Sequence, residues 1–281
     1  MPFLAGTALA YYDACDIRWA ILGLSVLAVI LIMLATYFGG EYFDFATDSM
    51  NTEYNRFSGG SRILPQGLIA SRKPLIASYI SLASVCAIGL VLFLYFGTGP
   101  FTIPLGAFGL MCGFFYTAPP FRWSYHSIGE LLIAICYGWL TVNTAYYLQT
   151  GQFSLLGTLV SIPFALSIFI VILINEFPDR AADHAAGKRT LVVRFGEEKM
   201  AKLYLLFLLL SFAAIPVGII FGLPKIVGFL SLALISLLYL NIKAVMKREF
   251  RQPKPLEKLC LRTIVYDLSL GAAYILGLLV A

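Results

Sequence analysis

The chain has 281 residues, of which 60% are hydrophobic and only 12% are charged. Soluble globular domains carry about 25% charged residues, so this composition excludes an ordinary soluble domain and indicates a membrane protein. The net charge of +5 belongs largely to the loops. With no aromatic-basic surface beside it, this charge indicates membrane topology and attraction to membrane lipids, and no nucleic-acid partner.

The apolar segments predict an all-α, polytopic membrane protein, because about 20 apolar residues cross a bilayer. A shorter apolar segment, Met1 to Tyr12, lacks the features of a signal peptide and is interpreted as a shortened first helix. We therefore expect about nine transmembrane helices around a central cavity, in a single transmembrane domain spanning residues 1–281. The eight longer segments are 20–43, 75–97, 101–119, 128–149, 154–177, 201–222, 224–246 and 263–281.

The basic residues predict the orientation, since Lys and Arg in loops favour the cytoplasm. Of the 20 Lys and Arg residues, only Arg18 and Lys225 fall on one side, and the others fall in alternate loops. This asymmetry predicts a cytoplasmic N-terminus, an outer C-terminus and a location in the cell (plasma) membrane. The long polar loops, and any site on them, would face the cytoplasm.

Two acidic motifs stand at the ends of apolar segments, where acids are costly. Residues three or four apart share one helix face, so each motif presents a column of oxygen atoms. Two facing columns would suit Mg²⁺, which is held by carboxylates together with substrate phosphates. An isolated acid could simply mark a helix end, but a matched pair favours a site. The motifs are Glu41, Asp44 and Asp48, and Asn175, Asp179 and Asp183.

The motifs end the second and sixth predicted helices, and this spacing indicates an internal repeat. Two four-helix halves, approximately 1–119 and 128–246, would be followed by a final helix, 263–281. In membrane proteins with such repeats, sites lie between the halves. Pro178 interrupts the sixth helix, either as a kink or as a simple helix end.

Basic residues follow both motifs closely: Arg62 after the first, and Lys188 and Arg189 after the second. Arg grips phosphate bidentately and Lys acts as a point charge, so these residues are predicted to bind a diphosphate. The alternative is that they only set topology. Tyr116 could turn its ring toward a cation, or could be an ordinary interfacial tyrosine. His126 is interpreted as interfacial.

Other chemistries have no motif here. The five cysteines, including Cys15, are scattered and form no CxxC pair, so neither a disulfide framework nor a zinc site is indicated. Hydrolase, zincin and P-loop motifs are also missing from the sequence.

The second motif, 175–183 (NEFPDRAAD), followed by 187–191 (GKRTL) and Arg194, resembles the second aspartate motif of UbiA-type intramembrane prenyltransferases. The segments 42–48 and 59–64 are similar to the first motif and its loop. Tyr116 to Pro120 and Gly129-Glu130 resemble the middle loop. The family's first motif is NDxxDxxxD, and here Gly40-Glu41 replaces its leading Asn-Asp, so Glu41 would supply one oxygen instead.

The resemblance implies nine helices around a cavity and Mg²⁺-dependent ionisation of a polyprenyl diphosphate, whose allylic cation passes to an acceptor. It implies that Tyr116 and the acids Asp44, Asp48, Asp179 and Asp183 are catalytic. Glu41 and Asn175 would complete the metal shell. The diphosphate would be bound by Arg62, Arg122, Lys188, Arg189 and Asn175.

The GKRTL and GGSR segments look most like the branch that acts on 1,4-dihydroxy-2-naphthoate or related quinone precursors in menaquinone synthesis. A 4-hydroxybenzoate, a glyceryl phosphate lipid or haem would use the same donor machinery. An ion-coupled transporter is the alternative from another class, since intramembrane acids often bind ions. Its coupling sites, however, usually lie near the bilayer centre.

Overall fold

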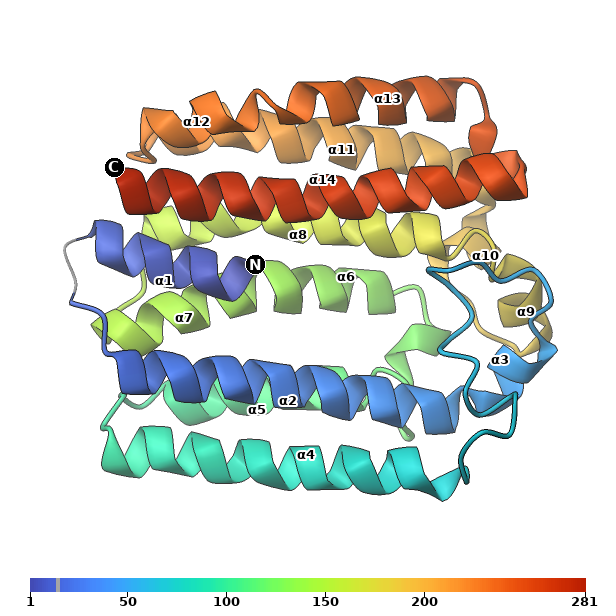
Figure 1. Ribbon diagram of the computed structural model, residues 1–281, viewed down its shortest axis with the longest axis horizontal. Helices are drawn as coiled ribbons and strands as arrows, with labels where there is room; N and C mark the ends of the chain where they lie inside the picture. Colours follow the sequence, from blue (N-terminus) through green and yellow to red (C-terminus); the bar gives the residue numbers. More distant parts are fainter. Residues whose placement is uncertain (14–15) are drawn as a thin grey trace. The chain divides into compact units, whose positions relative to one another are not determined.

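The computed structural model describes residues 1–13 and 16–281, and Cys15 lies outside them. Within these residues all regular secondary structure is helical and no strand is present (Figure 1), as the predicted all-α class requires. The helices form two compact units, one of residues 1–22, 133–174 and 197–281, and the other of 23–132 and 175–196. These units do not follow the boundaries of the predicted repeat, which stays a prediction.

The first unit is built around its C-terminal helix. α14 packs against α1, α12 and α13, and α1 also packs along α7 (Figure 1). The elements of this unit are α1 (Pro2–Tyr12), η3 (Ile135–Leu140), α7 (Thr141–Thr150), α8 (Leu155–Asn175), α11 (Glu197–Ile220), α12 (Lys225–Ser231), α13 (Leu234–Met246), η4 (Glu249–Arg251) and α14 (Pro253–Val280).

A buried carboxylate lies in the apolar part of α14. Asp267 is 4% exposed. Tyr137 donates its hydroxyl to Oδ2 of Asp267 at 2.8 Å, and Ser167 donates to Oδ1 at 2.6 Å. Buried polar groups are costly unless they are hydrogen-bonded, so these two bonds tie η3 and α8 to α14.

Replacing Asp267 with alanine is expected to lower the free energy of unfolding by about 1–3 kcal/mol, because two buried hydroxyls lose their acceptor. Tyr137→Phe should cost less, since it removes one bond and strands no donor. Thermal unfolding in detergent measures both, with Lys254→Ala, an exposed change on the same helix, as the control. Equal midpoints for Asp267→Ala and Lys254→Ala would contradict the expectation.

The second unit carries both acidic motifs. Within it α4 packs against α5, and the short helix α3 packs against α9 (Figure 1). Its elements are α2 (Trp19–Phe43), α3 (Phe45–Met50), α4 (Arg72–Leu90), η1 (Val91–Tyr95), α5 (Thr102–Phe114), η2 (Trp123–Tyr125), α6 (Gly129–Ala134), α9 (Arg180–Ala185) and α10 (Leu191–Phe195).

Six helical stretches of the described chain are long and apolar enough to cross a membrane, or seven if the bent pair α12 and α13 is one span. The predicted segment 224–246 corresponds to this pair, which bends by 47°. The predicted segment 101–119 contains only the 13-residue α5. Pro119 and Pro120, which disfavour helix in the preceding residues, follow it.

The last helix begins earlier than predicted, at Pro253. The first turns of this helix are rich in charged residues, and for this reason the sequence predicts a loop there. Proline is well placed at the first helical position, because its missing N–H has no intrahelical partner there. The change from charged to apolar residues therefore marks where the apolar stretch begins, but the helix itself begins earlier.

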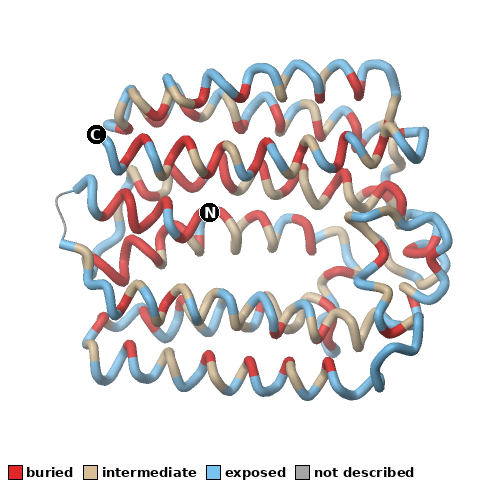
Figure 2. Tube along the Cα trace, in the orientation of Figure 1, coloured by how far each residue is buried: buried red, intermediate tan, exposed pale blue. Residues whose placement is uncertain are grey.

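The outer faces of α2 and α4 remain exposed. Only 17% of the apolar window of α2 is buried, and 22% of that of the helix running through α4 and η1. Figure 2 shows α4 exposed along most of its length. Exposed apolar surface of this extent is unusual for a soluble protein and fits contact with lipid.

Candidate active site

The two acidic motifs meet where α3 packs against α9. Asp44 immediately precedes α3 and Asp179 immediately precedes α9. The N–H of Asp48 donates to the carbonyl of Asp44 at 2.9 Å, and that of Asp183 to the carbonyl of Asp179 at 2.8 Å. The expected helical spacing is therefore kept between Asp44 and Asp48 and between Asp179 and Asp183, and each motif crosses a break between two helices.

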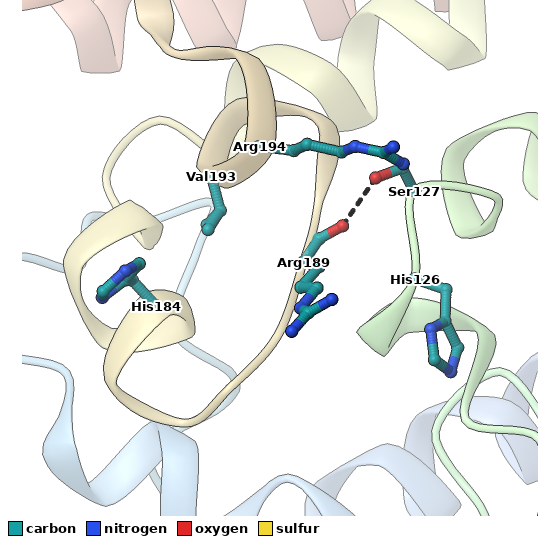
Figure 3. A pocket seen from close by; sticks show the side chains of 6 residues that line it. All are labelled: His126, Ser127, His184, Arg189, Val193 and Arg194. Atoms are coloured by element: carbon teal, nitrogen blue, oxygen red, sulfur yellow. Dashed lines mark hydrogen bonds between the residues drawn. The ribbon is translucent and has the colours of Figure 1, made fainter.

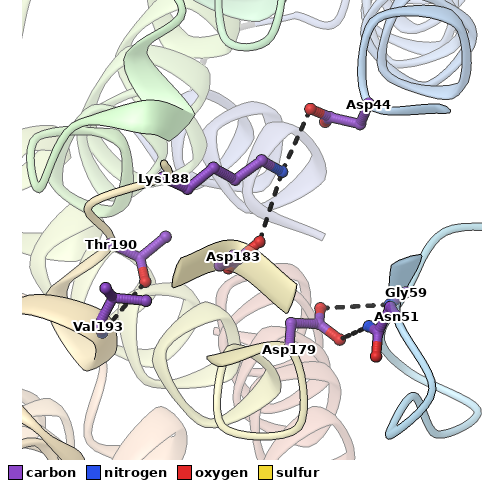
Figure 4. Close-up of polar contacts among 8 residues, drawn as sticks. All are labelled: Asp44, Asn51, Gly59, Asp179, Asp183, Lys188, Thr190 and Val193. Carbon is purple, nitrogen blue, oxygen red and sulfur yellow. Dashed lines mark hydrogen bonds and ion pairs between the residues drawn. The ribbon is translucent and has the colours of Figure 1, made fainter. Parts of the chain in front are cut away.

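Lys188 lies between the two motifs (Figure 4). Its Nζ is 3.2 Å from Oδ1 of Asp44 and 3.7 Å from Oδ1 of Asp183, and all three side chains are at most 15% exposed. Burial alone would lower the pKa of Lys188, but the two carboxylates outweigh it and raise this pKa. Lys188 is therefore a buried cation that joins one acid from each motif.

The carboxylates carry more negative charge than this lysine offsets. Burial, with the neighbouring Asp44 carboxylate, raises the pKa of Asp48 to about 7. Burial also raises the pKa of Asp183 to about 6, although Lys188 opposes it. The pKa values of Asp44 and Asp179 are raised by burial too. Such crowding of buried acids is common at functional sites.

The loop after the first motif folds back over the acids. Asn51 donates its Nδ2 to Oδ1 of Asp179 at 2.7 Å, and the N–H of Gly59 donates to Oδ2 at 3.2 Å (Figure 4). The N–H of Ser61 donates to Oε1 of Glu41 at 2.9 Å. At Gly60, where φ is +68°, an added Cβ would collide with the carboxylate of Asp48. Glycine is therefore required for the loop to approach the acids this closely.

Asn51→Ala is expected to release this loop. The change removes a hydrogen bond to a carboxylate, worth about 1.5–3 kcal/mol. Limited proteolysis in detergent should show faster cleavage between residues 52 and 62, whereas Thr52→Ala, an exposed neighbour, should be cleaved like the wild type. Equal cleavage rates for the two variants would show that Asn51 does not hold the loop.

Two arginines and two tyrosines lie near the acids. Arg62 donates to the carbonyl of Asp48 and lies over the ring of Tyr54, 4.2 Å from its centroid. Arg122 lies 5.3 Å, and Lys188 5.2 Å, from the centroid of Tyr125. Arg122 also counteracts the burial that raises the pKa of Asp44. The predicted phosphate ligands Arg62, Arg122 and Lys188 thus all contact this group of residues.

Tyr116 stands beside a pair of glutamates. Burial, reinforced by the charges of Glu176 and Glu130, raises its pKa well above the ordinary range. Burial and the adjacent Glu130 likewise raise the pKa of Glu176. Glu130 accepts the N–H of Leu191 with Oε1 at 2.7 Å, and Gly129 leaves room for the ring of Tyr116. Burial therefore favours the protonated forms of the Tyr116 hydroxyl and the Glu176 carboxyl near the motifs.

Four residues near the acids have no role predicted from the sequence: Asn51, Tyr125, Glu130 and Glu176. Glu130 and Glu176 lie inside the quoted motifs, so acids within apolar segments were the available signal. Asn51 and Tyr125 have no such signal, because their contacts join residues far apart in the chain.

Arg189 lies apart from the acids. Its neighbour Lys188 turns toward Asp44 and Asp183, whereas Arg189 lines a different pocket with His126, His184 and Arg194 (Figure 3). Residues 188–190 are not helical, and in extended chain successive side chains point to opposite sides. The structure therefore separates two residues that were predicted to act together.

The donor set fits Mg²⁺ in chemistry, since it consists of carboxylate and amide oxygens. Oδ1 of Asn175 is shielded from solvent and finds no hydrogen-bond partner in the described part of the chain. The acids are not arranged as a ready metal centre: no three His, Cys, Asp or Glu side chains of residues 1–13 and 16–281 are grouped to hold an ion. The ammonium of Lys188 takes the place between Asp44 and Asp183 instead.

Comparison with known sequences gives the family. The sequence model of the UbiA prenyltransferase family matches residues 1–259. The chain is 30% identical over 201 residues to the 1,4-dihydroxy-2-naphthoate octaprenyltransferase of Bacillus subtilis, an alignment that covers 70% of this chain and 62% of that relative. It is 25% identical over 286 residues to the Escherichia coli enzyme of the same name, covering 98% and 89% of the two chains.

Solved structures share the fold. An apo UbiA homologue from Aeropyrum pernix superposes with a TM-score of 0.70 at 17% identity, covering 98% of this chain and 96% of that one. A UbiA homologue from Archaeoglobus fulgidus, bound to GPP and Mg²⁺, gives a TM-score of 0.60 at 14% identity, covering 100% and 95%.

The chain therefore belongs to the UbiA prenyltransferase family. The predicted family is confirmed. Its apolar helices and this family together define it as an integral membrane protein.

Proposed function

We propose that this protein transfers a prenyl group from a prenyl diphosphate to an aromatic acceptor in a Mg²⁺-dependent reaction. The observation that carries the proposal is the convergence of both acidic motifs on Lys188. Two sets of carboxylates facing one ammonium can hold a divalent cation and a diphosphate side by side, which is how Mg²⁺ usually binds in proteins.

The side chains divide into three roles. The lysine and arginines bind the diphosphate oxygens and position the allylic carbon; these are Lys188, Arg62 and Arg122. Tyr116 stands near the reacting end, where its ring face would stabilise an allylic cation. The metal-holding side chains are Glu41, Asp44, Asp48, Asn175, Asp179 and Asp183. When bound, Mg²⁺ would stabilise the charge that accumulates on the departing diphosphate.

The acceptor is proposed to be 1,4-dihydroxy-2-naphthoate or a related quinone precursor, as in menaquinone synthesis. The names of the Bacillus and Escherichia relatives support this choice. The acceptors 4-hydroxybenzoate, a glyceryl phosphate lipid and haem remain as alternatives, because they would require the same donor site. The donor is proposed to be a polyprenyl diphosphate, as the GPP and Mg²⁺ in the Archaeoglobus structure support.

We further propose nine transmembrane segments around a central cavity, with the N-terminus and the active site on the cytoplasmic side of the cell membrane. The half-length helix α1 and the short α5 would supply spans beyond the six or seven long ones. The basic loops support the orientation, and an apolar cavity would protect the cation from water.

An acceptor panel tests the proposal. Purified protein in detergent receives labelled prenyl diphosphates, Mg²⁺ and each of the four acceptors, and mass spectrometry identifies the products. We expect a prenylated naphthoate with Mg²⁺ and none with EDTA. If another acceptor is prenylated instead, the proposed acceptor is wrong and the proposed class of enzyme still holds. Diphosphate release that is unchanged in an Asp44→Asn/Asp179→Asn variant would overturn the proposed site.

A further inference from the structure

A pocket with a volume of about 490 Å³ lies in the unit that carries the acids (Figure 3). Three parts of the chain build it: the loop before α6, the helix α9, and α10 together with the segment that leads into it. Every ionisable side chain in its lining is basic. The lining residues are His126, Ser127, His184, Arg189, Val193 and Arg194.

Hydrogen bonds hold the walls of this basic pocket in place. The N–H of Arg189 donates to the carbonyl of Tyr125 at 3.0 Å, and the Ser127 hydroxyl donates to the carbonyl of Arg189 at 2.7 Å (Figure 3). Thr190 caps α10 by accepting the N–H of Val193 at 3.4 Å. The backbone that carries the arginines is thus fixed before any ligand arrives, which lowers the entropic cost of binding.

The basic pocket is separate from the acid site. Lys188 forms ion pairs with Asp44 and Asp183, whereas no carboxylate in the described ranges 1–13 and 16–281 forms an ion pair with Arg189 or Arg194. Figure 3 shows the guanidinium of Arg189 between the two histidines, and that of Arg194 reaching toward Ser127. The positive charge of the pocket is therefore available to an anion.

The side chains that line the basic pocket favour a phosphate group as the ligand. Guanidinium groups grip phosphate oxygens bidentately, and imidazole N–H groups and the Ser127 hydroxyl can donate to the remaining oxygens. The pocket also lies close in sequence to membrane-spanning segments, since Ser127 is followed by α6 at Gly129 and Arg194 by α11 at Glu197. Basic pockets at this level of a membrane protein can bind lipid head groups.

We infer that this pocket binds a phosphate group, supplied by the head group of an anionic lipid or by phosphate in solution. The inference does not depend on the proposed transferase activity, because it uses none of the acids and neither prenyl donor nor Mg²⁺.

The histidines provide the readout. The chain contains two, His126 and His184, and both line the pocket. In protein labelled with ¹³C-histidine, NMR spectra therefore report on this pocket alone. One arm titrates inorganic phosphate into protein in a neutral detergent. The other compares nanodiscs of phosphatidylcholine with nanodiscs that also contain increasing phosphatidylglycerol.

We expect saturable shifts of both histidine signals. Arg189→Gln/Arg194→Gln should weaken the apparent affinity by about tenfold or more, the range for lost charged hydrogen bonds. The matched control, Arg72→Gln/Arg180→Gln, removes the same charge from exposed positions outside the pocket and should bind like the wild type. If the first double variant does not fold, Arg194→Gln alone serves in its place.

Shifts in both arms support a phosphate site open to both sources. If only phosphatidylglycerol causes shifts, the site binds a lipid head group. If only inorganic phosphate causes shifts, the site binds a soluble ligand. The inference is overturned if neither probe shifts the histidine signals, or if the pocket variants and the control variants bind equally.

Discussion

Replacing Asp44 with asparagine is expected to lower kcat/KM for prenyl transfer by about 10²–10³, the usual cost of removing one electrostatic contact to the transition state. Asparagine keeps the shape of the side chain but loses the charge that faces Lys188 at 3.2 Å. Under the proposed mechanism the donor site then loses a carboxylate from its metal shell, and the diphosphate leaves less readily. Steady-state assays with a labelled prenyl diphosphate measure the loss.

The fold should survive this change. Lys188 keeps a carboxylate partner in this variant, because Asp183 lies 3.7 Å from its Nζ. Glu53→Gln is the matched control, because it neutralises an exposed carboxylate in the loop after the first motif. If Asp44→Asn and Glu53→Gln were equally active, Asp44 would have no part in the reaction.

Hydrophobicity and motif spacing predicted the class of fold and the family, because both depend on local sequence. The segments 20–43 and 154–177 agree with α2 and α8 to within two residues. The spacing of Asp44 and Asp48, and of Asp179 and Asp183, is kept by helical hydrogen bonds. Such spacing is a property of the backbone and can be predicted without tertiary structure.

The partners of the acids could not be predicted in the same way. Asn51 and Asp179 are 128 residues apart, and nothing in the local pattern of either indicates the contact. The opposite directions of Lys188 and Arg189 depend on the irregular backbone after α9, which fixes Arg189 to Tyr125 and Ser127. Composition likewise gave no sign of the break between α12 and α13, since neither Gly nor Pro lies at residues 232–233.

Lys188→Gln is expected to destabilise the metal-free protein by about 3–5 kcal/mol, the cost of breaking a buried ion pair by removing one partner. Asp44 and Asp183 would then face each other without a countercharge, and Asp48 and Asp179 would add to the repulsion. Thermal unfolding with EDTA measures this loss. Lys202→Gln, an exposed change outside the site, should leave the midpoint unchanged.

The same variant is expected to respond more strongly to Mg²⁺ than the wild type. In the wild type the ammonium of Lys188 already offsets Asp44 and Asp183, so a divalent cation must compete with it for these oxygens. Without the lysine there is no competitor, and at a given Mg²⁺ concentration tighter binding to the folded state gives a larger gain in stability. Replacing EDTA with Mg²⁺ should therefore raise the unfolding midpoint more in Lys188→Gln than in the wild type. The rate of prenyl transfer should fall in this variant, because the diphosphate loses a cationic ligand. Equal rises in the two proteins would mean that Lys188 and the metal use different carboxylates.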